Sequence, residues 1–234
     1  MKKIIFIFAV FFVQNNIISS DQELFLQGNS YFLDGKFEKA RQSYEAMVSK
    51  DSAVLQNVGN CFFNEKNVVQ ALIYWKRAEK GARFNQLRQL FELEHKALEQ
   101  MQCQPESFLM RHIKQVVLGV PYLVLQIILL ILCLLFIGFF YRGTIQKKRM
   151  FILLLSMGSI LLWMVMYKKW LSKKEAVVVE QKIAVYIGPE TNFPQKTTLS
   201  LGNIVEIVEE QQKMVRVASS QGTGWVVRDM IEIV

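Results

Sequence analysis

The sequence predicts a multi-domain α+β membrane protein in which helical hairpins, two transmembrane helices and a small β barrel follow one another. Three observations lead to this prediction. Two long stretches carry no charged residue, Val116–Phe140 and Met150–Tyr167. Residues 21–104 repeat a pattern of small and bulky side chains at a fixed offset. After Lys174 the chain changes to short β-branched runs separated by turn residues, which is typical of small all-β domains.

Residues 1–20 have the composition of a signal peptide. Lys2 and Lys3 form a charged start, Ile4–Val13 is apolar on all sides, and a short polar tail ends in small residues. This order of regions is that of a secretion signal, and we expect cleavage after Ser20. An uncleaved anchor is the alternative, and it would send the following segment to the same side of the membrane.

Residues 21–104 contain a repeat whose two units match at one constant offset. Small residues of the first unit match small residues of the second, and bulky residues match bulky ones: Gly28-Asn29 with Gly59-Asn60, Ala40 with Ala71, and Tyr44 with Trp75. Small residues let two antiparallel helices approach closely, so this pattern predicts helical hairpins. Asp34-Gly35-Lys36 is a natural turn between helices, whereas Lys66 stands where the second unit would have its turn glycine.

This repeat resembles the tetratricopeptide repeat, whose usual period is about 34 residues. Residues 82–100 are interpreted as a degenerate repeat or capping helix, because such arrays need about three units to bury a core. The resemblance implies an inner groove that binds extended peptides or partner helices. Its candidate residues are Phe25, Asn29, Phe32, Gln56, Asn60 and Asn64. The alternative is that Gly-Asn is a common structural solution in these repeats, and the sequence leaves both interpretations open.

The two uncharged stretches, residues 116–140 and 150–167, are predicted transmembrane helices joined by the short basic loop 141–149. At about 1.5 Å per helical residue they reach about 38 Å and about 27 Å, against a hydrocarbon core of about 30 Å. The first is long enough to cross with a tilt, or it begins as an interfacial turn around Pro121. Aromatic residues near the ends of both stretches suit the membrane interface. A pair of buried helices in a soluble protein is the alternative.

Two crossings joined by a short loop place the preceding and following regions in the same compartment. The signal peptide predicts that both regions lie outside the cytoplasmic membrane of a bacterium. The basic residues favour the opposite orientation, because six flank the spans on the side of the soluble regions and four lie in the loop. We give the signal peptide more weight because it acts first during export.

Residues 175–234 are predicted to form a small β barrel. Five short runs suit strands: Ala176–Val179, Ile183–Tyr186, Ile204–Val208, Met214–Val217 and Trp225–Val226. Together with the turn Gly188-Pro189, these runs resemble a bacterial SH3-like domain. Trp225 is interpreted as a core residue, and Tyr186 and Phe193 form the candidate ligand-facing surface. So few aromatic residues do not support recognition of polyproline, which needs several of them on one surface.

Composition and motifs exclude several classes of function. The net charge of +8 comes from residues 111–174, which hold ten basic and no acidic residues beside the predicted spans, where they can bind anionic lipid headgroups. A nucleic-acid-binding function is therefore not expected. Cys61, Cys103 and Cys133 form neither a disulfide framework nor a zinc motif, although a bridge between the first two stays open. Nucleotide-binding and zinc-protease motifs do not occur, so the sequence predicts no enzyme, no metal and no cofactor.

The order of signal peptide, tetratricopeptide pair, membrane hairpin and SH3-like domain resembles the BatE-type proteins of the Bacteroides aerotolerance (Bat) operons. This resemblance implies a part of an envelope complex with von Willebrand-type membrane partners. The expected function is a scaffold, anchored in the lipid bilayer, that binds partner proteins through its repeats and its SH3-like domain. The alternative is a module that binds cell-wall peptidoglycan or senses the state of the envelope.

Overall fold

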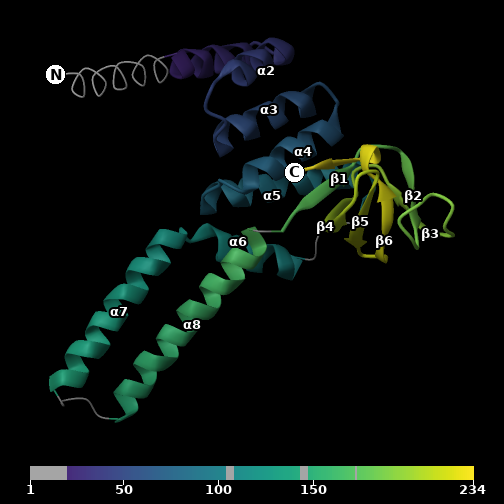
Figure 1. The fold of residues 1–234 in the computed structure, drawn as a ribbon. Helices are drawn as coiled ribbons and strands as arrows, with labels where there is room; N and C mark the ends of the chain where they lie inside the picture. Colours follow the sequence, from purple (N-terminus) through teal and green to yellow (C-terminus); the bar gives the residue numbers. More distant parts are fainter. Residues whose placement is uncertain (1–19, 104–107, 143–146, 172) are drawn as a thin grey trace, which may run out of the picture. The chain divides into compact units, whose positions relative to one another are not determined.

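The computed structural model describes residues 20–103, 108–142, 147–171 and 173–234 (Figure 1). Helical hairpins followed by a seven-stranded antiparallel sheet confirm the predicted α+β class. The chain divides into two compact units. The first comprises the described residues within Met1–Ala82, Glu92–Pro105 and Lys174–Val234, and the second those within Arg83–Phe91 and Glu106–Lys173. Residues 1–19 of the predicted signal peptide and residues 143–146 of the predicted basic loop lie outside the described residues.

Helical hairpins form the first part of the first unit. In chain order the helices are residues 20–33, α2 (Phe37–Ala46), α3 (Ser52–Asn64), α4 (Val68–Glu79) and α5 (Phe84–Gln100), whose C-terminal part belongs to this unit. The carboxylate of Asp51 caps α3 by accepting a hydrogen bond from the backbone N–H of Val54 at 2.9 Å. The side chain of Asn67 caps α4 in the same way. These caps satisfy amides that a helix leaves without an internal partner and fix where each helix begins.

The sheet of the first unit follows residue 173. Its strands are β1 (Glu175–Val178), β2 (Lys182–Tyr186), β3 (Gln195–Ser200), β4 (Ile204–Glu210), β5 (Met214–Ser219), β6 (Gly222–Val227) and β7 (Ile231–Ile233), with a short 3-10 helix η1 (Arg228–Met230) before the last. The strand order is β3-β2-β6-β5-β4-β1-β7. Each of the five predicted runs lies in or overlaps a strand. The sequence patterns did not predict β3, which is largely polar and exposed, or β7, which is very short.

Neighbouring valines of β1 pack into two different cores. Val178 belongs to the interior of the sheet, together with Ile183, Val205 and Val226. Val177 belongs to a second core with residues of the helices and the end of the chain: Leu72 and Ile73 of α4, Leu98 of α5, Cys103 and Val234. Because successive side chains of a strand point to opposite faces, one short strand joins the sheet to the helical hairpins.

Polar contacts reinforce this junction between α4 and the last strand. The Arg77 guanidinium lies 2.7 Å from the carboxylate of Glu232, and the Lys80 ammonium donates to the backbone oxygen of Val234 at 2.7 Å. The Gln70 amide also donates to Glu232, at 3.3 Å. The helical hairpins and the sheet, which the sequence suggests are separate domains, therefore share a core and a polar rim within one unit.

The second unit contains α6 (Phe108–Gly119), α7 (Tyr122–Arg142) and α8 (Lys147–Leu171). Among the described residues, one helix is long and apolar enough to cross a membrane, at Ile152–Lys169. A second candidate arises if Leu109–Gly119 and Tyr122–Ile137, which meet at an angle of 67°, are counted as one bent span. The predicted first span, 116–140, therefore does not form one straight helix. Its first residues belong to α6, and the chain turns at Pro121. The sequence allowed for a turn here, and its location at the membrane interface stays a prediction.

Candidate functional site

The two helical units place equivalent side chains in equivalent contacts. The Tyr44 hydroxyl donates to Asn29 Oδ1 at 2.7 Å, and the Trp75 indole N–H donates to Asn60 Oδ1 at 3.2 Å. Tyr44 and Trp75 are almost completely buried. Burial raises the pKa of the Tyr44 hydroxyl to about 12, which keeps the hydroxyl protonated and able to donate. Each Gly-Asn pair therefore holds the large aromatic residue of the following helix.

The glycine of each pair leaves the space that the aromatic ring occupies. A Cβ atom at Gly28 would lie 2.6 Å from the nearest ring atom of Tyr44, and one at Gly59 would lie 2.5 Å from the indole nitrogen of Trp75. Real side chains do not approach so closely, so the ring would have to move. This explains in physical terms why the repeat carries glycine at both positions.

The turns that follow the first helix of each unit also match. Gly35 has φ +74° and Lys66 has φ +67°, so both residues adopt the left-handed conformation. In both turns the residue at this position donates to a backbone oxygen three residues earlier, and the next residue donates to one five residues earlier. This is the Schellman ending of a helix, which favours glycine. Lys66 accepts the conformation at an energetic cost.

The start of each first helix contacts the end of its own hairpin. The Asp21 carboxylate accepts hydrogen bonds from the backbone N–H groups of Ser49 and Val48, and these hydrogen bonds lower the pKa of Asp21. At the equivalent position of the next unit, the Ser52 hydroxyl donates to the backbone oxygen of Ala78 at 2.7 Å. Both units thus join the start of the first helix to the end of the hairpin, through a carboxylate acceptor in the first unit and a hydroxyl donor in the second.

The predicted groove residues lie on the first helix of each unit with different degrees of exposure. Phe25 and Phe32 are half-buried and contact the rings of Tyr44 and Phe37, with ring centroids 5.8 Å and 5.3 Å apart. Gln56 is half-buried, and its backbone oxygen accepts from the Trp75 indole.

The three asparagines of the candidate groove differ in what they can offer a ligand. The side-chain oxygens of Asn29 and Asn60 accept hydrogen bonds inside the hairpins, as described above. Asn64 is exposed, and its amide donates to the backbone oxygen of Asn60, one turn earlier on the same helix, at 2.8 Å. The arrangement gives the two Gly-Asn asparagines a structural role and leaves their amide N–H groups as the atoms that could meet a ligand.

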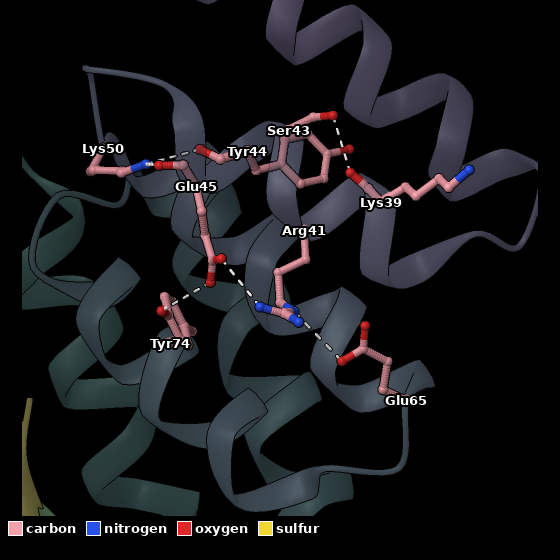
Figure 2. A network of polar contacts seen from close by, with 8 residues as sticks. All are labelled: Lys39, Arg41, Ser43, Tyr44, Glu45, Lys50, Glu65 and Tyr74. Atoms are coloured by element: carbon pink, nitrogen blue, oxygen red, sulfur yellow. Dashed lines mark hydrogen bonds and ion pairs between the residues drawn. The ribbon is translucent and has the colours of Figure 1, made fainter.

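A polar network joins the two repeat units (Figure 2). The sequence did not predict it. Arg41 of α2 pairs with Glu45 of the same helix at 3.2 Å and with Glu65, just after α3, at 3.6 Å. Tyr74 of α4 donates to the other carboxylate oxygen of Glu45 at 3.4 Å. The Arg41 guanidinium also lies 4.8 Å from the centre of the Phe62 ring. An arginine and a glutamate one helical turn apart were the available signal, but such spacing also occurs on solvated helices.

The candidate surface of the sheet lies around the end of β2. Tyr186 is half-buried, and its backbone pairs with Trp225 of β6 and Gln195 of β3. The side chain of Phe193 is 42% exposed, and its ring lies over Gly188, where a Cβ atom would approach it to 2.5 Å. Ile187, at 61% exposure, was not predicted. Trp225 is buried, which confirms its interpretation as a core residue.

The cysteines form neither a disulfide nor a metal site among the described residues. Cys61, Cys103 and Cys133 are free, so the bridge between Cys61 and Cys103 that the sequence left open is not formed. Burial raises the pKa of the Cys61 thiol to about 12 and also raises the pKa of Cys103, which disfavours the reactive thiolate at both residues. Within the ranges that the structure describes, no group of three or more histidine, cysteine or acidic residues could hold a metal ion.

Comparison with known proteins does not assign the chain to a family. No known protein family matches the sequence. No curated protein matches it either.

Proposed function

We propose that the protein is a membrane-anchored scaffold that binds partner proteins through its tetratricopeptide-like helices, on the outer side of a bacterial cytoplasmic membrane. The observation that carries this proposal is the contact pattern that both units repeat, in which Gly28 and Gly59 pack under Tyr44 and Trp75. Repeated helical hairpins of this kind present an extended surface formed by equivalent helices, and such surfaces bind peptides or partner helices. The protein has no catalytic role in this proposal.

The sheet completes the helical array in this scaffold. Two hairpins alone are fewer than the three or so units that usually bury a continuous core. Here Val177 of β1 and Val234 cover Leu72 and Ile73 of α4, which are fully buried. The SH3-like region therefore serves as the cap of the array. In this proposal the repeats and the sheet act together as one binding body.

Asn64 offers a cleaner test of the groove than the two Gly-Asn asparagines. Replacing Asn29 or Asn60 with alanine would remove the hydrogen bond that holds Tyr44 or Trp75, so lost binding could result from a distorted hairpin. Asn64 is exposed, and its one described hydrogen bond is to its own helix. Gln42 of α2 is also exposed and lies outside the candidate groove, which makes it a matched control.

Site-specific photocrosslinking in native membranes tests the proposal. A benzophenone amino acid at position 64 should give discrete adducts that mass spectrometry identifies as membrane proteins, with von Willebrand-type partners expected from the family resemblance. The same amino acid at Gln42 should give none of these adducts. Equal adducts from both positions, or none from position 64, would contradict a binding groove.

Binding of cell-wall peptide is the second candidate function, and exposed apolar residues on the sheet favour it. Ile187 and Phe193 lie on the connection between β2 and β3, which closes through a hydrogen bond from the Ile187 N–H to the Pro194 oxygen at 3.1 Å. Purified sacculi should retain the full chain in detergent if this surface binds peptidoglycan. Ile187→Ser should abolish that retention, whereas the control Val208→Ser, at an exposed position of β4, should not. Retention unchanged by Ile187→Ser would exclude this surface.

A further inference from the structure

Helix α6 is amphipathic and forms the first segment of the bent candidate span. Three apolar side chains, Leu109, Ile113 and Val116, lie along one face and are exposed, Leu109 to 70%. Their spacing of three to four residues places them on successive turns of the helix. Arg111 and Lys114 lie on the other side, where the Lys114 ammonium lies 5.7 Å from the centre of the Phe91 ring of α5. Helix α6 contains no acidic residue. An exposed apolar face with a basic opposite face is typical of helices that lie at a membrane surface.

Contacts within the second unit place α6 beside aromatic residues at the adjoining ends of α7 and α8. The Trp163 indole N–H of α8 donates to the backbone oxygen of Val117 in α6 at 3.4 Å. One turn further along α8, the ring of Tyr167 lies 5.6 Å from that of Tyr122, the first residue of α7. Tryptophan and tyrosine concentrate where the hydrocarbon core meets the headgroups. Lys168 and Lys169 follow Tyr167 directly, which also indicates that this end of α8 lies among the headgroups.

The angle between α6 and α7 fits the same location. The two helices meet at 67°, and Pro121 lies between them. The bend between α6 and α7 can be followed in Figure 1. With α7 along the membrane normal, α6 would therefore lie much closer to the membrane plane than to the normal. Such an orientation turns one long face of the helix toward the lipid.

We propose that α6 is an interfacial helix, with Leu109, Ile113 and Val116 inserted at the boundary of the acyl chains. This inference rests on the proposed membrane anchor. A partner protein covering the same face is the alternative. Three features favour lipid. Helix α6 has no acidic residue, it leads directly into α7, and the nearby Trp163 and Tyr167 are residue types that concentrate at the membrane interface.

Fluorescence quenching in lipid nanodiscs tests this location with the full chain. Cys133→Ser provides the background, because Cys61 and Cys103 are buried and burial disfavours their thiolates. Single cysteines labelled with nitrobenzoxadiazole replace Leu109 on the apolar face, Arg111 on the basic side, or Leu130, an exposed residue of α7. The nanodiscs contain phosphatidylcholine with a minor fraction of phosphatidylglycerol.

Each label has a distinct expected result. Lipids brominated near the headgroup should quench the Leu109 label at least twofold, and iodide should quench it several-fold less than the Arg111 label. Lipids brominated deep in the acyl chain should quench the Leu130 label.

Two results would overturn the inference about α6 alone. They are equal iodide quenching of the Leu109 and Arg111 labels, and a Leu109 label shielded from both brominated lipid and iodide, which would show that protein covers the face. A Leu130 label that brominated lipid does not quench would instead overturn the membrane anchor of the proposed function.

Discussion

Replacing Gly59 with alanine tests the packing on which the helical array depends. The added Cβ would lie 2.5 Å from the indole nitrogen of Trp75 and 3.1 Å from the backbone oxygen of Ala71. The indole is fully buried and donates to Gln56 and Asn60, so it has no space to move into without losing those hydrogen bonds. Gly28→Ala should act in the same direction, because Tyr44 occupies the equivalent place in the first unit.

The expected loss of stability combines two contributions that lower it and one that raises it. Overpacking a well-packed core costs about 1–3 kcal/mol. A weakened indole hydrogen bond costs about 1 kcal/mol more. Alanine stabilises a helix by about 1 kcal/mol relative to glycine, which offsets part of this loss. We therefore expect Gly59→Ala to lower the local unfolding free energy by about 2 kcal/mol, which corresponds to about a 30-fold change in an equilibrium constant.

Hydrogen exchange measured by mass spectrometry on the full chain in nanodiscs provides the assay. Amides of α3 and α4 in Gly59→Ala should exchange about 30-fold faster than in the parent protein, because their exchange follows the local opening equilibrium. Gly81→Ala is the matched control, since its Cβ would meet only the Ser52 side chain at an ordinary 3.6 Å. Exchange in Gly59→Ala as slow as in Gly81→Ala would refute the packing argument.

The same measurement checks three further predictions. Lys66→Gly should stabilise its hairpin by up to about 1 kcal/mol and Gly35→Ala should destabilise the other by about as much, because both positions have positive φ. The pKa of Asp21 is lowered from 3.8 in the folded state, so its stabilisation is present above that value and is lost as the pH falls through the folded pKa; Asp21→Asn should remove this acid dependence. Val177→Ala should speed exchange in both the sheet and α4, whereas Val178→Ala, with the same change of volume, should speed it in the sheet alone.

Periodic features of the fold could be predicted from the sequence, because small, bulky and β-branched residues recur at the positions where packing requires them. The constant offset between matching residues identified the helical hairpins, and the structure places Gly28 with Tyr44 and Gly59 with Trp75 in equivalent contacts. The β-branched runs identified most strands for a similar reason, since alternate residues of a half-buried strand must be apolar. Strand β3 escaped because its side chains are mostly polar and exposed, so it carries little apolar signal.

Contacts between distant segments could not be read in the same way. The junction of α4 with β1 and β7 depends on Val177 facing the helices and Val178 facing the sheet, and two adjacent valines give no sign of which faces which. The Arg77–Glu232 pair joins residues 155 positions apart. Asn60 was predicted as a groove residue from its place in the repeat, but its internal bond to Trp75 becomes visible only once the hairpin is formed.

In the proposed function lipid surrounds α7 and α8, and extraction of native membranes at alkaline pH tests this most directly. The exposed apolar side chains along both helices, such as Leu130 and Leu161, should keep the chain in the membrane pellet after carbonate treatment and release it only with detergent. Release into the supernatant by carbonate alone would show that protein surrounds these helices, and the anchored scaffold would then be contradicted.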